Sequence, residues 1–279
     1  MNEQKILTGK GITVAVLDTG IFPHIDFDNR IAAFRDLVYG RETPYDDNGH
    51  GTHVCGILGG SGRASGGKYR GTAPECRFVV AKILDRRGNG RKQDILAAID
   101  WVCKERIRLN IRILNISVGT TSRDHKEQTD LLEGVEKLWD LGFVVVAAAG
   151  NQGPGAGTVT APGSSRKIIT VGSSDLLTGR TAISGRGPTF ECVCKPDLVA
   201  PGNHVLACAP GADNGYGVKS GTSMSTPLVA GAAALMLEKN PELTNVQIKM
   251  KLKESARDMG LPKNQQGWGE LDLERFMEL

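Results

Sequence analysis

"RFVVAKILDRRGNGRKQDILAAIDWVCKERIRLNIRILNISV", residues 77–118, is the stretch that decides the fold. Its two ends, 77–84 and 111–118, are rich in β-branched residues and predict buried strands. Between them, the apolar residues of 93–107 recur at helical spacing, with charged residues on the opposite face. A strand, a helix and a second strand in this order predict one crossover unit of a parallel sheet.

The same alternation extends to both sides of this stretch. A second helical pattern, 129–142, ends at Gly142, a residue type that is favoured just past a helix terminus. Further buried strands are predicted at 12–17, 143–149 and 167–172. The chain therefore predicts an α/β fold, a three-layer sandwich with a mostly parallel central sheet. Because neither a linker nor an internal repeat interrupts it, residues 1–279 are expected to form a single domain.

Composition and charge exclude several classes of protein. Hydrophobic residues make up 40% and charged residues 23%, as is ordinary for a globular domain. A net charge of +3 without a run of like charges does not predict binding to nucleic acid or to a membrane. The N-terminus has no basic segment followed by an apolar stretch, so no signal peptide is predicted. Either the protein is cytoplasmic, or a leader lies outside this chain.

The six cysteines are predicted to be free thiols. They could pair into three disulfides, but a chain of this size is not a small scaffold that needs them. Cys192 and Cys194 lack a second cysteine pair or histidines at zinc spacing, so no structural zinc is predicted. Cys55 follows His50 closely, as a buried core thiol or as a thiol near a reactive group.

Three polar residues near the start of the chain are candidates for chemistry, and two of them, His50 and His53, compete for one role. Ligands of parallel sheets bind at the carboxyl ends of the strands, and Asp18 directly follows the strand at 12–17. His50 and His53 lie in "DDNGHGTHVCGILGG" (46–60), a glycine-rich loop that runs into a helix. Their spacing would suit a metal ion, but no third ligand occurs at a matching helical offset, so no metal site is predicted.

Two further candidates come later in the chain. Ser223 lies at the start of the apolar stretch "GTSMSTPLVAGAAALML" (221–237), where Ser220 or Thr222 could cap the helix. Free N–H groups at a helix N-terminus stabilise developing negative charge, which suits a nucleophilic serine in acyl transfer. Asn151 follows the strand at 143–149 and could supply another donor at the same edge, although asparagine after glycine is also a common turn residue.

The segments "VAVLDTG", "HGTHV", "AAAGN" and "GTSMSTP", in this order, resemble the subtilisin-like serine proteases, the subtilase family. "GTAPECRFVVAKIL", "KPDLVAPG" and "GWGELDL" are also similar, so the resemblance covers nearly the whole chain. It implies a serine endopeptidase in which Asp18 orients His50, His50 acts as base and then acid, and Ser223 attacks the scissile carbonyl. Asn151 and the Ser223 N–H would bind the oxyanion. His53 becomes a structural residue.

The resemblance also implies where a polypeptide substrate would bind. The peptide would add as an extended strand between Gly88, Asn89 and Gly90 on one side and Ser117, Val118 and Gly119 on the other. The pocket for the residue before the cut would be lined by 117–119, by 148–151, which includes Ala149 and Gly150, and by Thr160. Because none of these residues is charged, we expect an uncharged or apolar residue there.

The loop "DRRGNGRK" (85–92) carries four cations and has two interpretations. It is either a solvated loop or a source of preference for acidic residues upstream of the cut. The four cations are Arg86, Arg87, Arg91 and Lys92.

Calcium binding and catalytic activity each have an alternative interpretation. The chemistry requires no cofactor; many subtilases bind calcium, and Asp26 is a candidate ligand, but no loop offers the dense oxygen cluster that calcium requires. Leu228 stands after Pro227, where family members often have a histidine. The chain is most similar in style to the intracellular bacterial subtilases, which implies a cytoplasmic location; the alternative is a secreted protein whose leader and prodomain were removed from this chain. The expected state is a monomer. A pseudoenzyme or binding module with the same fold is the alternative to an active endopeptidase.

Overall fold

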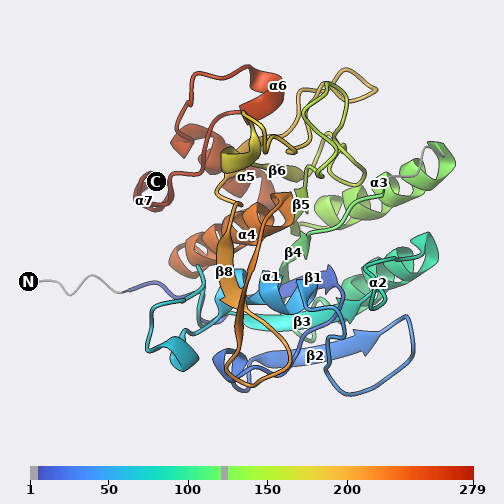
Figure 1. The fold of residues 1–279 in the computed structure, drawn as a ribbon, viewed down its shortest axis with the longest axis vertical. Coiled ribbons are helices and arrows are strands. Elements are labelled where there is room, and N and C mark those ends of the chain that lie inside the picture. Colours follow the sequence, from blue (N-terminus) through green and yellow to red (C-terminus); the bar gives the residue numbers. More distant parts are fainter. Residues whose placement is uncertain (1–5, 121–124) are drawn as a thin grey trace, which may run out of the picture.

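A parallel sheet of seven strands forms the centre of the protein in a computed structural model that describes residues 6–120 and 125–279 (Figure 1). The strand order is β2-β3-β1-β4-β5-β6-β7, and each neighbouring pair is parallel. The strands are β1 Thr13–Asp18, β2 Ile31–Asp36, β3 Arg77–Lys82, β4 Ile111–Ile116, β5 Val144–Ala148, β6 Ile169–Ser173 and β7 Leu198–Ala200.

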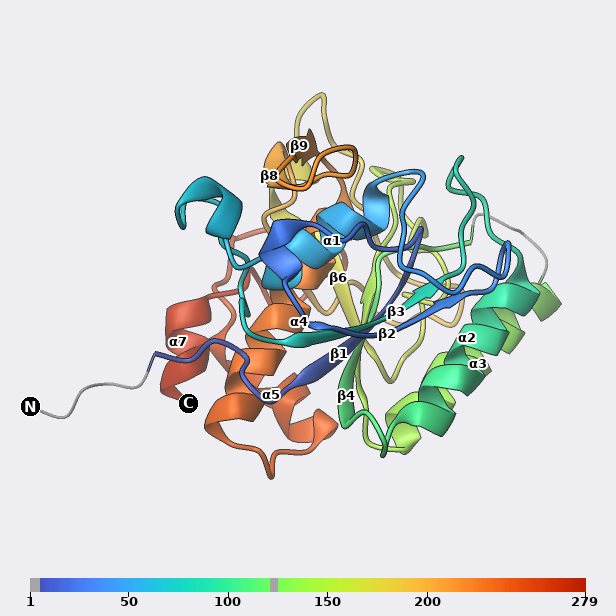
Figure 2. The ribbon, with the colours of Figure 1, turned by 90° about the horizontal axis from the view of Figure 1, so that it is seen from below.

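Helices cover both faces of the sheet (Figure 2). α2 and α3 lie together on one face, while α1, α4, α5 and α7 lie on the other. The helices are α1 His50–Gly59, α2 Lys92–Glu105, α3 His125–Asp140, α4 Thr222–Lys239, α5 Asn245–Ser255, α6 Lys263–Gln266 and α7 Leu273–Glu278, with 3-10 turns at Ile25–Phe27, Arg63–Ser65 and Ser174–Leu176. The predicted three-layer α/β sandwich with a mostly parallel sheet is confirmed.

Four strands were not predicted from the sequence. β2 is only half-buried, and β7 spans three residues, so neither shows the long apolar run of an inner strand. β8 (Val205–Cys208) and β9 (Tyr216–Lys219) form a separate antiparallel hairpin. Such short or half-exposed strands depend on their neighbours more than on their own sequence.

α4 is the buried helix of the fold. Its residues from Thr222 to Leu237 are buried apart from Leu228, and it packs on β4, β5 and β6 as well as on α1. A Cβ on Gly231 would lie 2.6 Å from the Thr72 Cβ, so only glycine permits this close approach. Among the described residues, no helix is long and apolar enough to cross a lipid bilayer.

The start of α4 corrects one prediction. The N-cap is Gly221, and no side chain caps it, so neither Ser220 nor Thr222 has the predicted capping role. The Ser220 hydroxyl instead donates to Asn203 Oδ1, and Thr222 is the first helical residue. Both residues lie at the right place in the chain for a cap, but neither side chain points toward the free N–H groups of α4.

Candidate active site

The four candidate residues come from elements whose ends meet at one edge of the sheet. β1 ends at Asp18, and Asn151 follows β5, two strands away in the sheet order. His50 begins α1 and Ser223 is the second residue of α4. The structure therefore brings Asp18, His50, Asn151 and Ser223 to the carboxyl edge of the sheet, the usual ligand-binding edge of parallel sheets.

Asp18 and His50 form a hydrogen-bonded pair. His50 Nδ1 lies 2.7 Å from Asp18 Oδ1, and Asp18 is completely buried while the His50 side chain is 24% exposed. Because a carboxylate only accepts, Nδ1 carries the proton and Nε2 keeps its lone pair. Burial acts to lower the pKa of His50, but the charge and hydrogen bond of Asp18 outweigh it, so the pKa of His50 is raised above its ordinary value.

The loop before His50 fixes the start of α1. Asp46 Oδ1 accepts hydrogen bonds from Gly49 N (2.8 Å), and Asp46 Oδ2 accepts from Thr52 N (2.9 Å). A carboxylate at this position also interacts favourably with the positive end of the helix dipole. Asn48 Oδ1 accepts from the His50 N–H, so the backbone of His50 is held as well.

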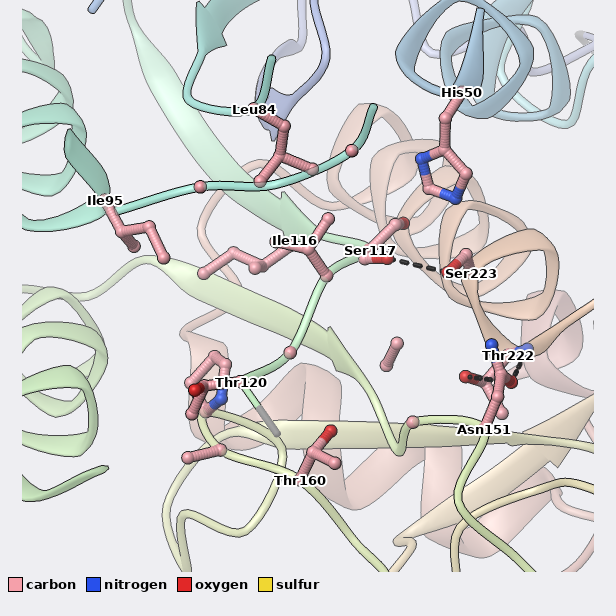
Figure 3. Close-up of a pocket in the computed structure, with 18 of the residues that line it drawn as sticks. His50, Leu84, Ile95, Ile116, Ser117, Thr120, Asn151, Thr160, Thr222 and Ser223 are labelled. Carbon is pink, nitrogen blue, oxygen red and sulfur yellow. Dashed lines mark hydrogen bonds between the residues drawn. The ribbon is translucent and has the colours of Figure 1, made fainter. Parts of the chain in front are cut away.

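Ser223 is bonded differently from the expectation. Figure 3 shows the His50 ring above Ser223, but the Ser223 hydroxyl donates to the carbonyl oxygen of Ser117 at 2.7 Å. The structure records no hydrogen bond between the described side chains of His50 and Ser223. Ser223 is buried, at 9% exposure, and buried hydroxyl groups normally have a hydrogen-bond partner, which here is the Ser117 carbonyl.

Asn151 is oriented by the residue before the serine. Asn151 Oδ1 accepts from Thr222 N at 3.0 Å and from Thr222 Oγ1 at 3.1 Å (Figure 3). With the acceptor end of the amide used in this way, the donor Nδ2 is the end left for a ligand. The Thr222 hydroxyl therefore fixes the amide rather than capping α4.

A cleft of about 520 Å³ joins these residues. Thr160 packs directly against the backbone of Gly119 and of Gly150. A Cβ atom would lie 2.3 Å from Thr160 Oγ1 if added to Gly119, and 2.5 Å from it if added to Gly150. Of the residues expected to bind substrate or react, the cleft is lined by Gly88, Asn89, Gly90, Ser117, Val118, Gly119, Gly150, Thr160, His50, Asn151 and Ser223.

Two expected residues do not line the cleft. Asp18 lies buried behind His50, as its pairing with Nδ1 requires. Ala149 was predicted as a lining residue, but its side chain is fully buried, and the neighbouring Ala148 lines the cleft instead. The backbone of Ala149 donates to Val171 O and accepts from Thr160 N, and successive side chains of extended backbone point to opposite sides.

The far end of the cleft has an apolar wall that the sequence reasoning missed. Leu84, Ile95 and Ile116 extend toward the cavity in Figure 3, and Leu131 also lines it. They come from the regions of β3, α2, β4 and α3. Such residues have no signal of their own in the sequence, because an apolar cleft wall and an apolar core have the same periodicity.

The basic loop is partly neutralised. Arg91 forms two hydrogen bonds with Asp94, and Lys92 pairs with Asp130 at 2.6 Å. No ion pair is recorded for Arg86 or Arg87 within residues 6–120 and 125–279, although Arg87 lies near enough to Asp85 to help lower the pKa of Asp85.

His53 and the cysteines have structural surroundings. His53 Nε2 lies 3.0 Å from both Val205 O and Gly217 O, so it joins α1 to the hairpin β8–β9, and burial lowers the pKa of His53 to about 4. Cys55 is fully buried and its pKa is raised well above the ordinary value by burial. All six cysteines are free, in agreement with the prediction.

His24, Asp26 and Cys208 form the single cluster of three potential metal ligands in the described part of the chain. Both ring nitrogens of His24 are engaged, with the Asp26 N–H and with Gly215 O. Asp26 accepts from Ala64 N and from the Tyr216 hydroxyl. A single carboxylate with a histidine and a thiol does not fit calcium, which prefers several oxygen ligands.

Comparison with known proteins gives a consistent family. A family model described as "Subtilase family" matches residues 9–269. The chain is 42% identical over 272 residues to Serine protease AprX of Bacillus subtilis (strain 168), covering 88% of this chain and 61% of that protein. It is 37% identical over 254 residues to Subtilisin Savinase of Lederbergia lenta, covering 91% of this chain and 86% of that one. The chain thus spans about three fifths of the length of AprX.

Solved structures share the fold along most of the chain. "S41 Psychrophilic Protease" superposes with a TM-score of 0.82 at 30% identity, covering 95% of this chain and 92% of that one. "Crystal structure of a cold adapted subtilisin-like serine proteinase" gives 0.76 at 32% identity, covering 95% and 88%.

Proposed function

The chain belongs to the Subtilase family, and from this premise we propose that it is a serine endopeptidase that hydrolyses peptide bonds through an acyl-enzyme intermediate. The observation that carries the proposal is the Asp18–His50 hydrogen bond of 2.7 Å, at the edge of a cleft that Ser223 and Asn151 also line. A binding module with this fold would require none of these four side chains.

In the proposed reaction, His50 Nε2 takes the proton of the Ser223 hydroxyl as the oxygen attacks the scissile carbonyl. For this step the hydroxyl must leave the Ser117 carbonyl, to which it donates in the structure. Asp18 keeps Nδ1 protonated and stabilises the imidazolium that forms. His50 then gives the proton to the leaving amine, and water completes the hydrolysis of the acyl enzyme by the same path.

Two donors would stabilise the oxyanion. The Ser223 N–H belongs to the first turn of α4, where backbone N–H groups have no intrahelical partner. Asn151 Nδ2 is the second donor, and Thr222 fixes its direction. Both groups are in place before the charge develops, which is what makes such donors effective.

The substrate is proposed to be a polypeptide in extended conformation. Gly88, Asn89 and Gly90 lie on one wall of the cleft and Ser117, Val118 and Gly119 on the other, so a peptide could add as a strand between them. The cleft-lining residues of 117–119, Ala148, Gly150, Asn151 and Thr160 itself are uncharged, which favours an uncharged residue before the cut. The apolar wall at the far end offers burial to an upstream apolar side chain.

Covalent labelling tests the proposal. A fluorophosphonate probe reacts with a serine only when a base activates it, so the wild-type protein should label and Ser223→Ala should not. Hydrolysis of an unstructured protein substrate should disappear in the same variant. A correctly folded wild-type protein that neither labels nor hydrolyses would leave the binding-module alternative standing.

A further inference from the structure

Lys82 carries a positive charge that is completely buried beside the active site. It is the last residue of β3, where it pairs in register with Asp18 of β1. Its Nζ donates three hydrogen bonds: to Thr19 O at 2.6 Å, to Asp47 Oδ1 at 2.6 Å and to Leu84 O at 2.8 Å. An ammonium group has three N–H donors, so all are used.

The three acceptors of Lys82 belong to three segments that lie beside the site, next to Asp18, before His50 and at the cleft wall. Thr19 directly follows Asp18, and its N–H donates to Asp18 Oδ1. Asp47 lies in the short loop that leads to His50. Leu84 lines the cleft and precedes the loop that carries Gly88, Asn89 and Gly90. A single Nζ atom therefore fixes the position of these segments relative to one another.

Two aromatic rings lie close to this buried charge. The Lys82 Nζ lies 5.1 Å from the ring centre of Tyr45 and 5.8 Å from that of Tyr39. The Tyr45 hydroxyl donates to Asp36 Oδ2, which holds that ring in place. Interactions of the ammonium group are strengthened where water is excluded, but removing a charge from water is costly, and an apolar side chain could fill a core position without that cost.

We propose that Lys82 is a positioning residue of the reaction, which holds Asp18, His50 and the cleft wall in register although it touches neither substrate nor the reacting atoms. The proposal rests on the endopeptidase function proposed above. Folded Lys82 variants should therefore have a lower kcat than the wild-type protein, by more than their loss of stability explains.

The chain contains a matched control for this effect. Lys195 is also buried, at 1% exposure, and its Nζ donates to Asp197 Oδ2 at 2.6 Å and to Ile168 O at 3.0 Å. Its partners lie at β6 and just before β7, away from the residues that line the cleft. Lys195→Met thus removes a buried lysine and its ion pair without touching the segments that Lys82 joins, although Asp197 keeps a second ion pair with Lys249 at 3.3 Å.

Lys82→Met and Lys195→Met should both lower the midpoint of thermal unfolding, by roughly 5–15 °C. Measured well below both midpoints on a short peptide anilide, Lys82→Met should lower kcat by about 10- to 100-fold with little change in KM, since small misplacements of catalytic groups have effects of this size. Lys195→Met should keep the wild-type kcat. Asp47→Asn, a milder change at a partly exposed partner, should lower kcat about fivefold and covers the case in which Lys82→Met does not fold.

The outcomes separate this inference from the proposed function. If the wild-type protein fails to label with a fluorophosphonate, both fall. If the wild type labels and hydrolyses, but folded Lys82→Met and Asp47→Asn keep its kcat and labelling rate, the positioning role of Lys82 is wrong while the function stands. Equal losses of kcat in Lys82→Met and Lys195→Met would also overturn it, because the effect would then be one of stability.

Discussion

At the residue scale, the orientation of single polar groups decides what the site can do. His50 Nδ1 is bound to Asp18, so Nε2 is the nitrogen that can accept a proton. Asn151 Oδ1 is bound to Thr222, so Nδ2 is the group that can donate. In both side chains, a hydrogen bond to one polar atom determines whether the other polar atom accepts or donates a proton or hydrogen bond.

The Asn151 donor gives a direct prediction. Asn151→Ala should lower kcat by about 10² to 10³, the loss seen when the corresponding kind of donor is removed from subtilisin. Asn151→Asp is the matched variant, since it keeps an acceptor for Thr222 but has no N–H, and it should lose turnover as well. Steady-state kinetics on a peptide anilide measures both. Unchanged turnover in a folded Asn151→Ala protein would contradict the role of Asn151.

His53 should make the fold sensitive to acid. Its pKa is lowered to about 4 in the folded protein, against an ordinary value of 6.5, so below pH 6.5 the unfolded chain binds a proton that the folded protein does not. The contribution of His53 to the free energy of unfolding is therefore complete above pH 6.5. It decreases as the pH drops toward 4, by about 3 kcal/mol in total.

Urea unfolding between pH 4 and 8 measures this effect, in a Ser223→Ala background that prevents self-digestion. His53→Gln should flatten the dependence on pH, while His24→Gln, at another buried histidine that contacts the same hairpin, should retain it because His53 is intact. Equal slopes in the wild-type and His53→Gln backgrounds would rule out His53 as the cause.

At the element scale, a rigid helix and a charged loop make different contributions. α4 is buried on several sides and holds Ser223 at a fixed place, as a nucleophile requires. The loop 85–92 is held at its centre, where Asn48 Nδ2 donates to Arg86 O, and at its end, where Lys92 pairs with Asp130, while the side chains of Arg86 and Arg87 extend from an exposed segment. Arg86 and Arg87 do not line the cleft, so their charges are expected to act on a substrate through space.

The loop is expected to favour acidic residues upstream of the cut. Arg86→Glu and Arg87→Glu should lower kcat/KM for peptides with acidic residues there by up to about fivefold, and the effect should fade with salt because the charges are exposed. Arg91→Gln is the control, since Asp94 already neutralises Arg91. Cleavage of a peptide library by the wild-type protein and the three variants measures this preference. Identical cleavage profiles for all four proteins would show that the loop is only a solvated surface segment.

At the scale of the whole molecule, one core connects the site to the rest of the fold. The buried cluster includes residues of β1, β3, β4, β5 and β6 and of α1, α2, α3 and α4. Both sides of the cleft therefore rest on the same packed interior, and the residues of the site cannot separate without disturbing it.

A single cooperative unfolding transition is expected for this core. Calorimetry of Ser223→Ala should show one peak, and loss of tertiary structure by near-ultraviolet circular dichroism should coincide with loss of helix by far-ultraviolet circular dichroism. Two separated transitions would instead mean that the chain contains more than one folding unit.

The sequence by itself determined the fold class and the identity of the candidate reactive residues. Apolar periodicity is a local property, so the strands near 12–17 and 143–149 and the helix near 93–107 could be predicted within a few residues. Asp18 and Asn151 could be proposed because each follows such a strand, and parallel strands bring their carboxyl ends to one edge.

Only the tertiary structure decided the surroundings of those residues. The apolar cleft wall, the Ser223–Ser117 hydrogen bond and the burial of Ala149 depend on segments far apart in the chain. Thr222 could equally have capped a helix, and Lys82 could have been an ordinary strand residue with its charge in solvent. These particular contacts arise from the packing of distant segments in three dimensions, which a local pattern of residue types does not encode.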